Sequence, residues 1–116
     1  MYFQAPYGYV AEETSITLNQ RQASVVWDIF SLFIHGDTPE EIAHKLNKFH
    51  IHTQRRHSHW QAEAICQILK NSTYATGILD RSAREPTLPS IIDRQMFDEA
   101  QSRLQELGLH RCCKPN

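Results

Sequence analysis

The chain has few of the features that mark a secreted, membrane-spanning or fibrous protein. It contains only three cysteines in 116 residues, and two of them, Cys112 and Cys113, are adjacent, so we expect no disulfide framework. No apolar run approaches the roughly 20 residues of a membrane helix, and no secretory signal opens the chain. There are four glycines, five prolines, and no repeat or low-complexity segment. We therefore expect a cytoplasmic protein that does not contact membranes.

The chain also lacks an overall excess of charge of either sign, because its net charge is −1. The charges are nevertheless unevenly distributed. Residues 1–44 carry one basic and six acidic side chains, whereas residues 45–70 carry five basic and one acidic. Between Lys45 and His59 there are four basic residues, four histidines and no carboxylate. Because affinity for phosphate depends on local charge, this segment is the candidate region for nucleic-acid binding.

The composition is that of one ordinary globular domain, with 41% hydrophobic and 22% charged residues. We place this domain at residues 5–107. Residues 1–4 resemble the remnant of a protease-site tag, and residues 108–116 are expected to form a flexible tail.

The apolar patterns predict an α+β domain that is mostly helical and has a small antiparallel sheet. Residues 6–10 and 15–18 are rich in aromatic and β-branched types, which predicts two strands with Glu12-Glu13 at the turn. The other predicted elements are a helix from about Gln20 to His35, a strand from Tyr74 to Leu79, and a final helix between Asp93 and Gly108. The apolar residues that mark the first of these as the central core helix are Val25, Val26, Ile29, Phe30 and Phe33.

Two shorter helices joined by a basic connector are predicted between Thr38 and Lys70. Thr38 suits an N-cap, Pro39 suits the first helical position, and Glu41 completes a capping box. The apolar stripes are Ile42, Ala43 and Leu46 in the first helix and Ile65, Ile68 and Leu69 in the second. A second helix with a polar outer face is typical of helix-turn-helix variants, so we expect a helix-turn-helix-like core.

Several short motifs follow one another in a recognisable order along most of the chain. They are Pro6-Tyr7-Gly8-Tyr9, the helix ending at Gly36, Ile42-Ala43-x-x-Leu46-Asn47, Thr53, Trp60, Ile68-Leu69-x-Asn71-x-x-Tyr74 and Ile91-Ile92-Asp93-x-x-x-Phe97. In this order and spacing they resemble the recombinase domain of the large serine recombinases, the class that includes phage integrases and mobile-element recombinases. The resemblance extends from about Ala5 to about Leu107.

This resemblance implies a DNA-binding module, not an enzyme. In that family the domain lies between a resolvase-like catalytic domain, which carries the nucleophilic serine, and a zinc-ribbon domain. It binds part of an attachment half-site with a recognition helix in the major groove. The parent protein would then be a site-specific DNA recombinase. The chain alone is expected to be a monomer, without a cofactor, whose partner is double-stranded DNA.

The candidate DNA contacts gather in the two shorter helices and their connector. Lys45 and Lys48 suit phosphates, and Arg55 and Arg56 could bind phosphates or enter a minor groove. The glutamine side chain suits adenine, and the glutamate side chain suits the amino group of cytosine. A solvated polar surface is the alternative for each of them. The full predicted set is Lys45, Lys48, Thr53, Arg55, Arg56, His57, His59, Gln61, Glu63, Gln67 and Lys70.

Three departures from the family pattern affect the presumed DNA-binding region. His50 stands at a left-handed position that usually holds glycine, which predicts mild backbone strain. Gln61 stands where serine or threonine usually caps the recognition helix, so this helix is expected to begin less firmly. Cys66 and Gln67 replace arginines, which lowers the positive charge of the presumed DNA-binding face.

Two further functions are open on the sequence alone. The neutral Cys66 and Gln67 favour a protein-interaction module that has lost its affinity for DNA. The other function is a small metal-binding regulator built on the residues His50, His52, His57, His59 and Cys66. These residues alternate along a loop without a zinc-type spacing, so we predict no metal site. Trp60, Tyr7 and Tyr9 are predicted to lie in the core.

Overall fold

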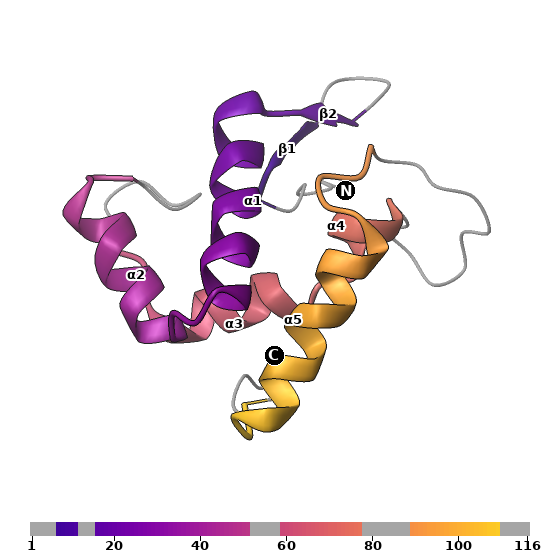
Figure 1. Cartoon of the computed structure of the whole chain (residues 1–116). Coiled ribbons are helices and arrows are strands. Elements are labelled where there is room, and N and C mark those ends of the chain that lie inside the picture. The colour runs from indigo at the N-terminus through magenta and orange to yellow at the C-terminus, as the bar shows by residue number, and fades with distance from the viewer. Residues whose placement is uncertain (1–6, 12–15, 52–58, 78–88, 110–116) are drawn as a thin grey trace.

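The computed structural model describes residues 7–11, 16–51, 59–77 and 89–109. Within them β1 (Tyr9–Ala11) and β2 (Ile16–Leu18) form a two-stranded antiparallel sheet. The helices are α1 (Gln20–Ile34), α2 (Pro39–Lys48), α3 (Ala62–Lys70), α4 (Thr73–Thr76) and α5 (Arg94–Glu106). Figure 1 shows α1 at the centre, with α2 and α5 on opposite sides and α3 below. The predicted mostly helical α+β class is confirmed.

Helix α1 is the central helix, as its apolar spacing predicts. Asn19 caps its first turn, because the Oδ1 atom of Asn19 accepts a hydrogen bond from the N–H of Gln22 at 3.1 Å. The five apolar residues predicted for this helix are all buried. They pack against α5, α2 and α3.

The hairpin is attached to the start of α1 through Gly8. Its N–H donates to the side chain of Gln22 at 3.0 Å, and its carbonyl accepts from the N–H of Asn19 at 2.9 Å. A Cβ atom at Gly8 would lie 2.8 Å from Cδ1 of Ile91, and its φ is +106°, so only glycine fits without movement. The strand predicted at residues 6–10 therefore begins later, because Tyr7 and Gly8 form a turn. The predicted turn at Glu12-Glu13 lies outside the described residues.

The predicted strand from Tyr74 to Leu79 is wrong in its described part. Residues 73–76 form the single helical turn α4, and Gly77 ends it with a left-handed φ of 73°. The side chain of Asn71 accepts from the N–H of Thr73 at 3.0 Å, and the carbonyl of Ser72 accepts from the N–H of Thr76 at 2.9 Å. These local bonds outweigh the β propensity of the threonine and tyrosine residues. Residues 78 and 79 lie outside the described part.

Helix α5 begins at a side-chain cap, because Oδ1 of Asp93 accepts from the N–H of Met96 at 2.7 Å. Its buried residues are Ala100 and Leu104, whereas Leu107, which follows the last residue of the helix, is 42% exposed. Gly108 closes the helix as predicted, with a φ of 70°. Gly108 and Leu109 therefore belong to the end of the helix, because the N–H of Leu109 donates to the carbonyl of Leu104 at 2.8 Å. The other residues of the predicted tail, 110–116, lie outside the described part.

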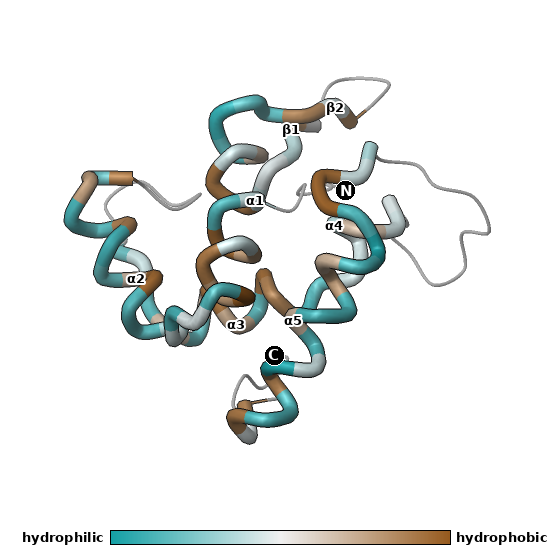
Figure 2. The backbone as a smooth tube through the Cα atoms, in the orientation of Figure 1, coloured by the Kyte–Doolittle hydropathy of each residue, from teal (hydrophilic) through white to brown (hydrophobic). Residues whose placement is uncertain are grey.

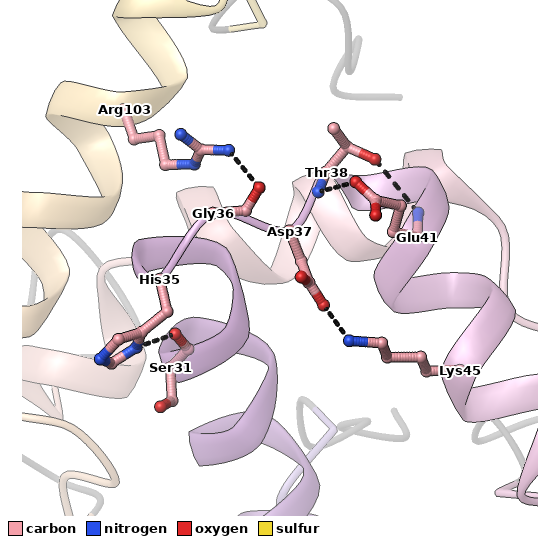
Figure 3. A network of polar contacts seen from close by, with 8 residues as sticks. All are labelled: Ser31, His35, Gly36, Asp37, Thr38, Glu41, Lys45 and Arg103. Atoms are coloured by element: carbon pink, nitrogen blue, oxygen red, sulfur yellow. Dashed lines mark hydrogen bonds and ion pairs between the residues drawn. The ribbon is translucent and has the colours of Figure 1, made fainter.

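The junction between α1 and α2 is held by a network of polar contacts (Figure 3). Thr38 and Glu41 form the predicted capping box, at 3.2 Å and 3.1 Å. Asp37 pairs with Lys45 at 2.6 Å, and the carbonyl of Gly36 accepts from Arg103 of α5 at 2.8 Å. This network fixes where α2 begins relative to α1 and α5.

The hydrophobic residues of these helices gather in a single core cluster. In Figure 2, α2 and α5 are mainly hydrophilic along their course, with short hydrophobic stretches. None of the described helices is both long and apolar enough to cross a membrane.

Candidate nucleic-acid interface

Helices α2 and α3 pack against each other, as the helix-turn-helix-like prediction requires. Both predicted apolar stripes are buried: Ile42, Ala43 and Leu46 in α2, and Ile65, Ile68 and Leu69 in α3. The pair shares the core with α1, because both helices contact it. The inner faces of α2 and α3 are therefore buried in the core, which fixes the orientation of their outer faces.

His50, two residues after the last residue of α2, has the predicted left-handed conformation, with a φ of 57°. The N–H of His50 donates to the carbonyl of Asn47, and the N–H of Ile51 donates to the carbonyl of Leu46, at 3.1 and 3.0 Å. This is the Schellman arrangement, in which glycine is usual. The same arrangement ends α1 at Gly36, where the N–H groups of Gly36 and Asp37 donate to the carbonyls of Phe33 and Leu32. His50 is the single non-glycine residue with a positive φ among the described residues.

The start of α3 is held against the end of α2 by Asn47 and Trp60. Oδ1 of Asn47 accepts from the N–H of Trp60 at 2.8 Å, and Nδ2 of Asn47 donates to the carbonyl of Trp60 at 2.9 Å. The Trp60 ring is 4% exposed and meets the Tyr7 ring edge-on, with 5.1 Å between centroids. The prediction that Trp60 is a core anchor is confirmed. The apolar pattern did not indicate that Asn47 bonds to Trp60, and Asn47 appeared in the sequence analysis only as part of the family motif.

Helix α3 begins without a side-chain cap, as predicted from Gln61 at its N-cap. Glu63 and Gln67 are exposed on its outer face, and Lys70 is partly buried at the end of the same face. Cys66, in contrast, is only 3% exposed. The interpretation of Cys66 as a neutral residue on the DNA-binding face is therefore wrong, because its position in the helix faces the core between Ile65 and Leu69.

The predicted cations of α2 differ in their surroundings. Lys45 is 46% exposed and forms an ion pair with Asp37, so part of its charge is already compensated. Lys48 is exposed at the end of α2 and forms no ion pair within the described ranges. His59 is exposed just before Trp60. Lys48 and His59 thus flank the two ends of the connector, and Lys48 is the better placed of the two lysines for a phosphate.

Four predicted contact residues of the connector lie outside the described residues: Thr53, Arg55, Arg56 and His57. Of the proposed metal-binding set, His52 and His57 are also outside. Within the described ranges no group of three or more histidine, cysteine or acidic side chains could hold a metal ion. Cys66 is buried on α3, whereas His50 and His59 are exposed.

A groove that the sequence reasoning missed lies between α1 and the end of α2. Its volume is about 320 Å³, and it is lined by Asp28, Ser31, Leu32, Lys45, Leu46, Phe49 and Ile51. Phe49 is 69% exposed at the edge of this groove. The sequence feature that could have indicated this groove is Phe49, an aromatic residue at the end of an amphipathic helix.

Three tyrosines pack under the hairpin, in agreement with the core position predicted for Tyr7 and Tyr9. The hydroxyl of Tyr74 donates to the carbonyl of Tyr7 at 2.7 Å, and that of Tyr9 donates to the carbonyl of Pro89 at 2.7 Å. Burial raises the pKa of Tyr7 and of Tyr9 to about 12. Burial, together with the two neighbouring tyrosines, raises the pKa of Tyr74 further.

Comparisons with known proteins agree with this arrangement. A family model described as Recombinase matches residues 20–106. The crystal structure of an LSR–DNA complex matches with a TM-score of 0.72 and 16% sequence identity. The match covers 93% of this chain but 33% of that one, so the chain spans about a third of the length of its structural relative. No curated protein sequence matches.

Proposed function

Because the chain belongs to the Recombinase family, we propose that it is the DNA-binding domain of a large serine recombinase. In this proposal the chain binds an attachment half-site in the cytoplasm, with α3 in the major groove. A separate serine domain of the parent protein cleaves and exchanges the strands. The candidate contacts are those predicted from the sequence, with the connector residues Arg55 and Arg56 as phosphate ligands.

The observation that carries the proposal is the outer face of α3. One side of this helix is buried in the core, whereas Glu63 and Gln67 on the other side are exposed. Asn47 and Trp60 hold the beginning of the helix at the end of α2, where Lys48 is exposed. A recognition helix needs this combination of a fixed orientation, an exposed polar face and a neighbouring cation.

Fluorescence anisotropy with a labelled mixed-sequence duplex at two salt concentrations tests the proposal. The double variant Arg55→Ala/Arg56→Ala and the variant Lys48→Ala should both weaken binding. The slope of log K against log salt should flatten by about 0.9 for each phosphate contact that is lost. The control is Arg94→Ala, because Arg94 is an exposed cation on α5, outside the α2–α3 pair. Equal slopes for all these proteins would contradict the proposal.

An amide NMR titration locates the surface directly. Salt-sensitive shifts should appear between residues 45 and 70 and leave most of α5 unchanged. Shifts confined to other regions, or no shifts at low salt, would remove the DNA-binding proposal.

A second candidate function is protein binding at the groove between α1 and α2. The exposed Phe49 and the apolar residues Leu32, Leu46 and Ile51 favour it. If this is the function, neutralising Arg55 and Arg56 should leave partner binding unchanged, whereas Phe49→Ser should abolish it.

A further inference from the structure

This inference rests on the proposed DNA binding and concerns which bases are recognised. We infer that Glu63 and Gln67 are specificity-determining residues, which select a cytosine and an adenine respectively. They are four positions apart in the sequence, or about 6 Å along the helix axis. Successive base pairs are about 3.4 Å apart along the DNA axis, and a recognition helix is inclined to that axis, so the two selected bases lie within about two base-pair steps of each other.

The two side chains are available for this role. Both are exposed, and they lie in one row on the side of α3 opposite the buried Ile65, Ile68 and Leu69. Within the described part of the chain, the side chains of Glu63 and Gln67 make no hydrogen bond or ion pair. Among the described residues, no side chain therefore competes with a DNA base for the polar groups of Glu63 and Gln67.

The chemistry of Glu63 restricts what it can contact. An ionised carboxylate accepts hydrogen bonds and donates none, and a phosphate group repels it. When α3 docks with its outer face on DNA, Glu63 is tolerated only opposite a donor. In the major groove the amino groups of cytosine and adenine are such donors, but adenine presents its N7 acceptor beside the amino group, and guanine presents two acceptors. Glu63 consequently discriminates between the two orientations of a G·C pair.

Gln67 has a different selectivity. Its side-chain amide carries a donor and an acceptor, which match the N7 and N6 positions of adenine in a bidentate contact. Gln67 lies in the middle of α3, where it caps no helix end. Glu63, in contrast, also lies in the first turn, where its negative charge interacts favourably with the helix N-terminus. The variant that tests Glu63 is therefore Glu63→Gln, which keeps the shape of the side chain.

The experiment is a selection of duplexes from a library with a randomised central segment, using the full chain at low salt. We expect the wild type to enrich a cytosine and an adenine within about two base-pair steps of each other. Gln67→Ala should lower the preference for adenine by about 5- to 150-fold and keep that for cytosine. Glu63→Gln should change the selected cytosine to an adenine, because a glutamine then occupies that position.

Gln105→Ala is the matched control, because Gln105 is an exposed glutamine on α5. It should select the same duplexes as the wild type. Urea unfolding of each variant checks that the fold is intact, as expected for exposed positions. Selection profiles that neither Gln67→Ala nor Glu63→Gln alters would overturn the inference. Salt-dependent binding without any base preference would also overturn it, while leaving the proposed DNA binding in place. No binding at low salt would overturn both.

Discussion

The side-chain amide of Asn47 forms two hydrogen bonds with the backbone of Trp60, one to its N–H at 2.8 Å and one to its carbonyl at 2.9 Å. Asn47 lies in the last turn of α2, and Trp60 lies two residues before the first residue of α3. The amide group of an asparagine side chain has an N–H donor and a carbonyl acceptor. It can therefore bond to both the N–H and the carbonyl of one residue, as the backbone of a neighbouring β-strand does. This pair closes a loop of 13 residues and fixes the beginning of α3.

Removing this side chain should destabilise the protein and weaken DNA binding together. Asn47→Ala leaves two backbone groups of a largely buried residue without partners, which costs about 1–3 kcal/mol. Urea unfolding measures this loss, and anisotropy with the duplex measures the loss of affinity. Gln105→Ala, an exposed change on α5, should leave both quantities unchanged.

Asn47→Asp separates the two hydrogen bonds. The aspartate keeps the acceptor for the N–H of Trp60 but presents a second oxygen to the carbonyl. We expect this variant to be destabilised at pH 7 and to recover relative to the wild type below about pH 4, where the carboxyl group is protonated and can donate. A variant as stable as the wild type at pH 7 would show that the bond to the carbonyl contributes nothing.

The left-handed His50 should be a site where glycine stabilises the protein. At a φ of 57° a side chain with a Cβ atom is strained, and glycine is not. Part of the gain is lost because glycine makes the unfolded chain more flexible, so His50→Gly should stabilise the protein by about 0.5 kcal/mol.

The opposite change at Gly36 provides the comparison. A Cβ atom at Gly36 would meet nothing within 4 Å, so Gly36→Ala tests backbone strain alone at a φ of +124°. It should cost about 1 kcal/mol or more. Equal and small effects of both substitutions on thermal unfolding would refute the strain argument.

Helix α3 should be stabilised by a better N-cap. Gln61 makes no side-chain bond to the first turn, so Gln61→Ser should add one and stabilise the protein by about 0.5–1 kcal/mol. Thr38→Ala at the capping box of α2 is the complementary control and should cost about 1 kcal/mol. If the serine variant gave no gain, the first N–H groups of α3 would have to be satisfied by other partners.

Alkaline pH should unfold the protein through its buried tyrosines. In the folded chain the pKa of Tyr7 and of Tyr9 is about 12, above the ordinary value of 10.0. Between these values the unfolded chain releases protons that the folded chain retains. The stabilisation is therefore complete below pH 10 and is lost as the pH rises towards 12. Tyrosinate absorbance should rise together with the loss of the far-ultraviolet helix signal, and Tyr9→Phe should reduce this pH dependence.

The parts of the fold that the sequence predicted well are those with a local physical cause. The five buried residues of α1, the capping box at Thr38 and the cap at Asp93 all follow from side chains a few positions apart. The left-handed His50 followed from the family resemblance, because the family usually has glycine at this position. In the candidate interface, the same spacing correctly placed Glu63 and Gln67 on the exposed side of α3.

The predictions that were wrong depended on weak or competing local signals. The β propensity around Tyr74 was outweighed by the hydrogen bonds of Asn71 and Ser72, which form α4. The placement of Cys66 on the outer face of α3 followed from the arginines that the family has at this position, whereas Cys66 is buried here beside Ile65 and Leu69. The predicted contacts at Thr53, Arg55, Arg56 and His57 lie outside the described residues and stay predictions.

The sequence by itself thus determined the four longer helices, the main apolar stripe that each of α1, α2 and α3 buries, and that the basic charge gathers between α2 and α3. Only the tertiary structure decided that Asn47 pairs with Trp60, that Lys45 is bound to Asp37, and that Phe49 borders a groove. Periodicity and caps act between neighbours in the chain and can be read from their order. A hydrogen bond between residues 13 positions apart, or a groove between two helices, depends on distances that exist only after the helices have packed.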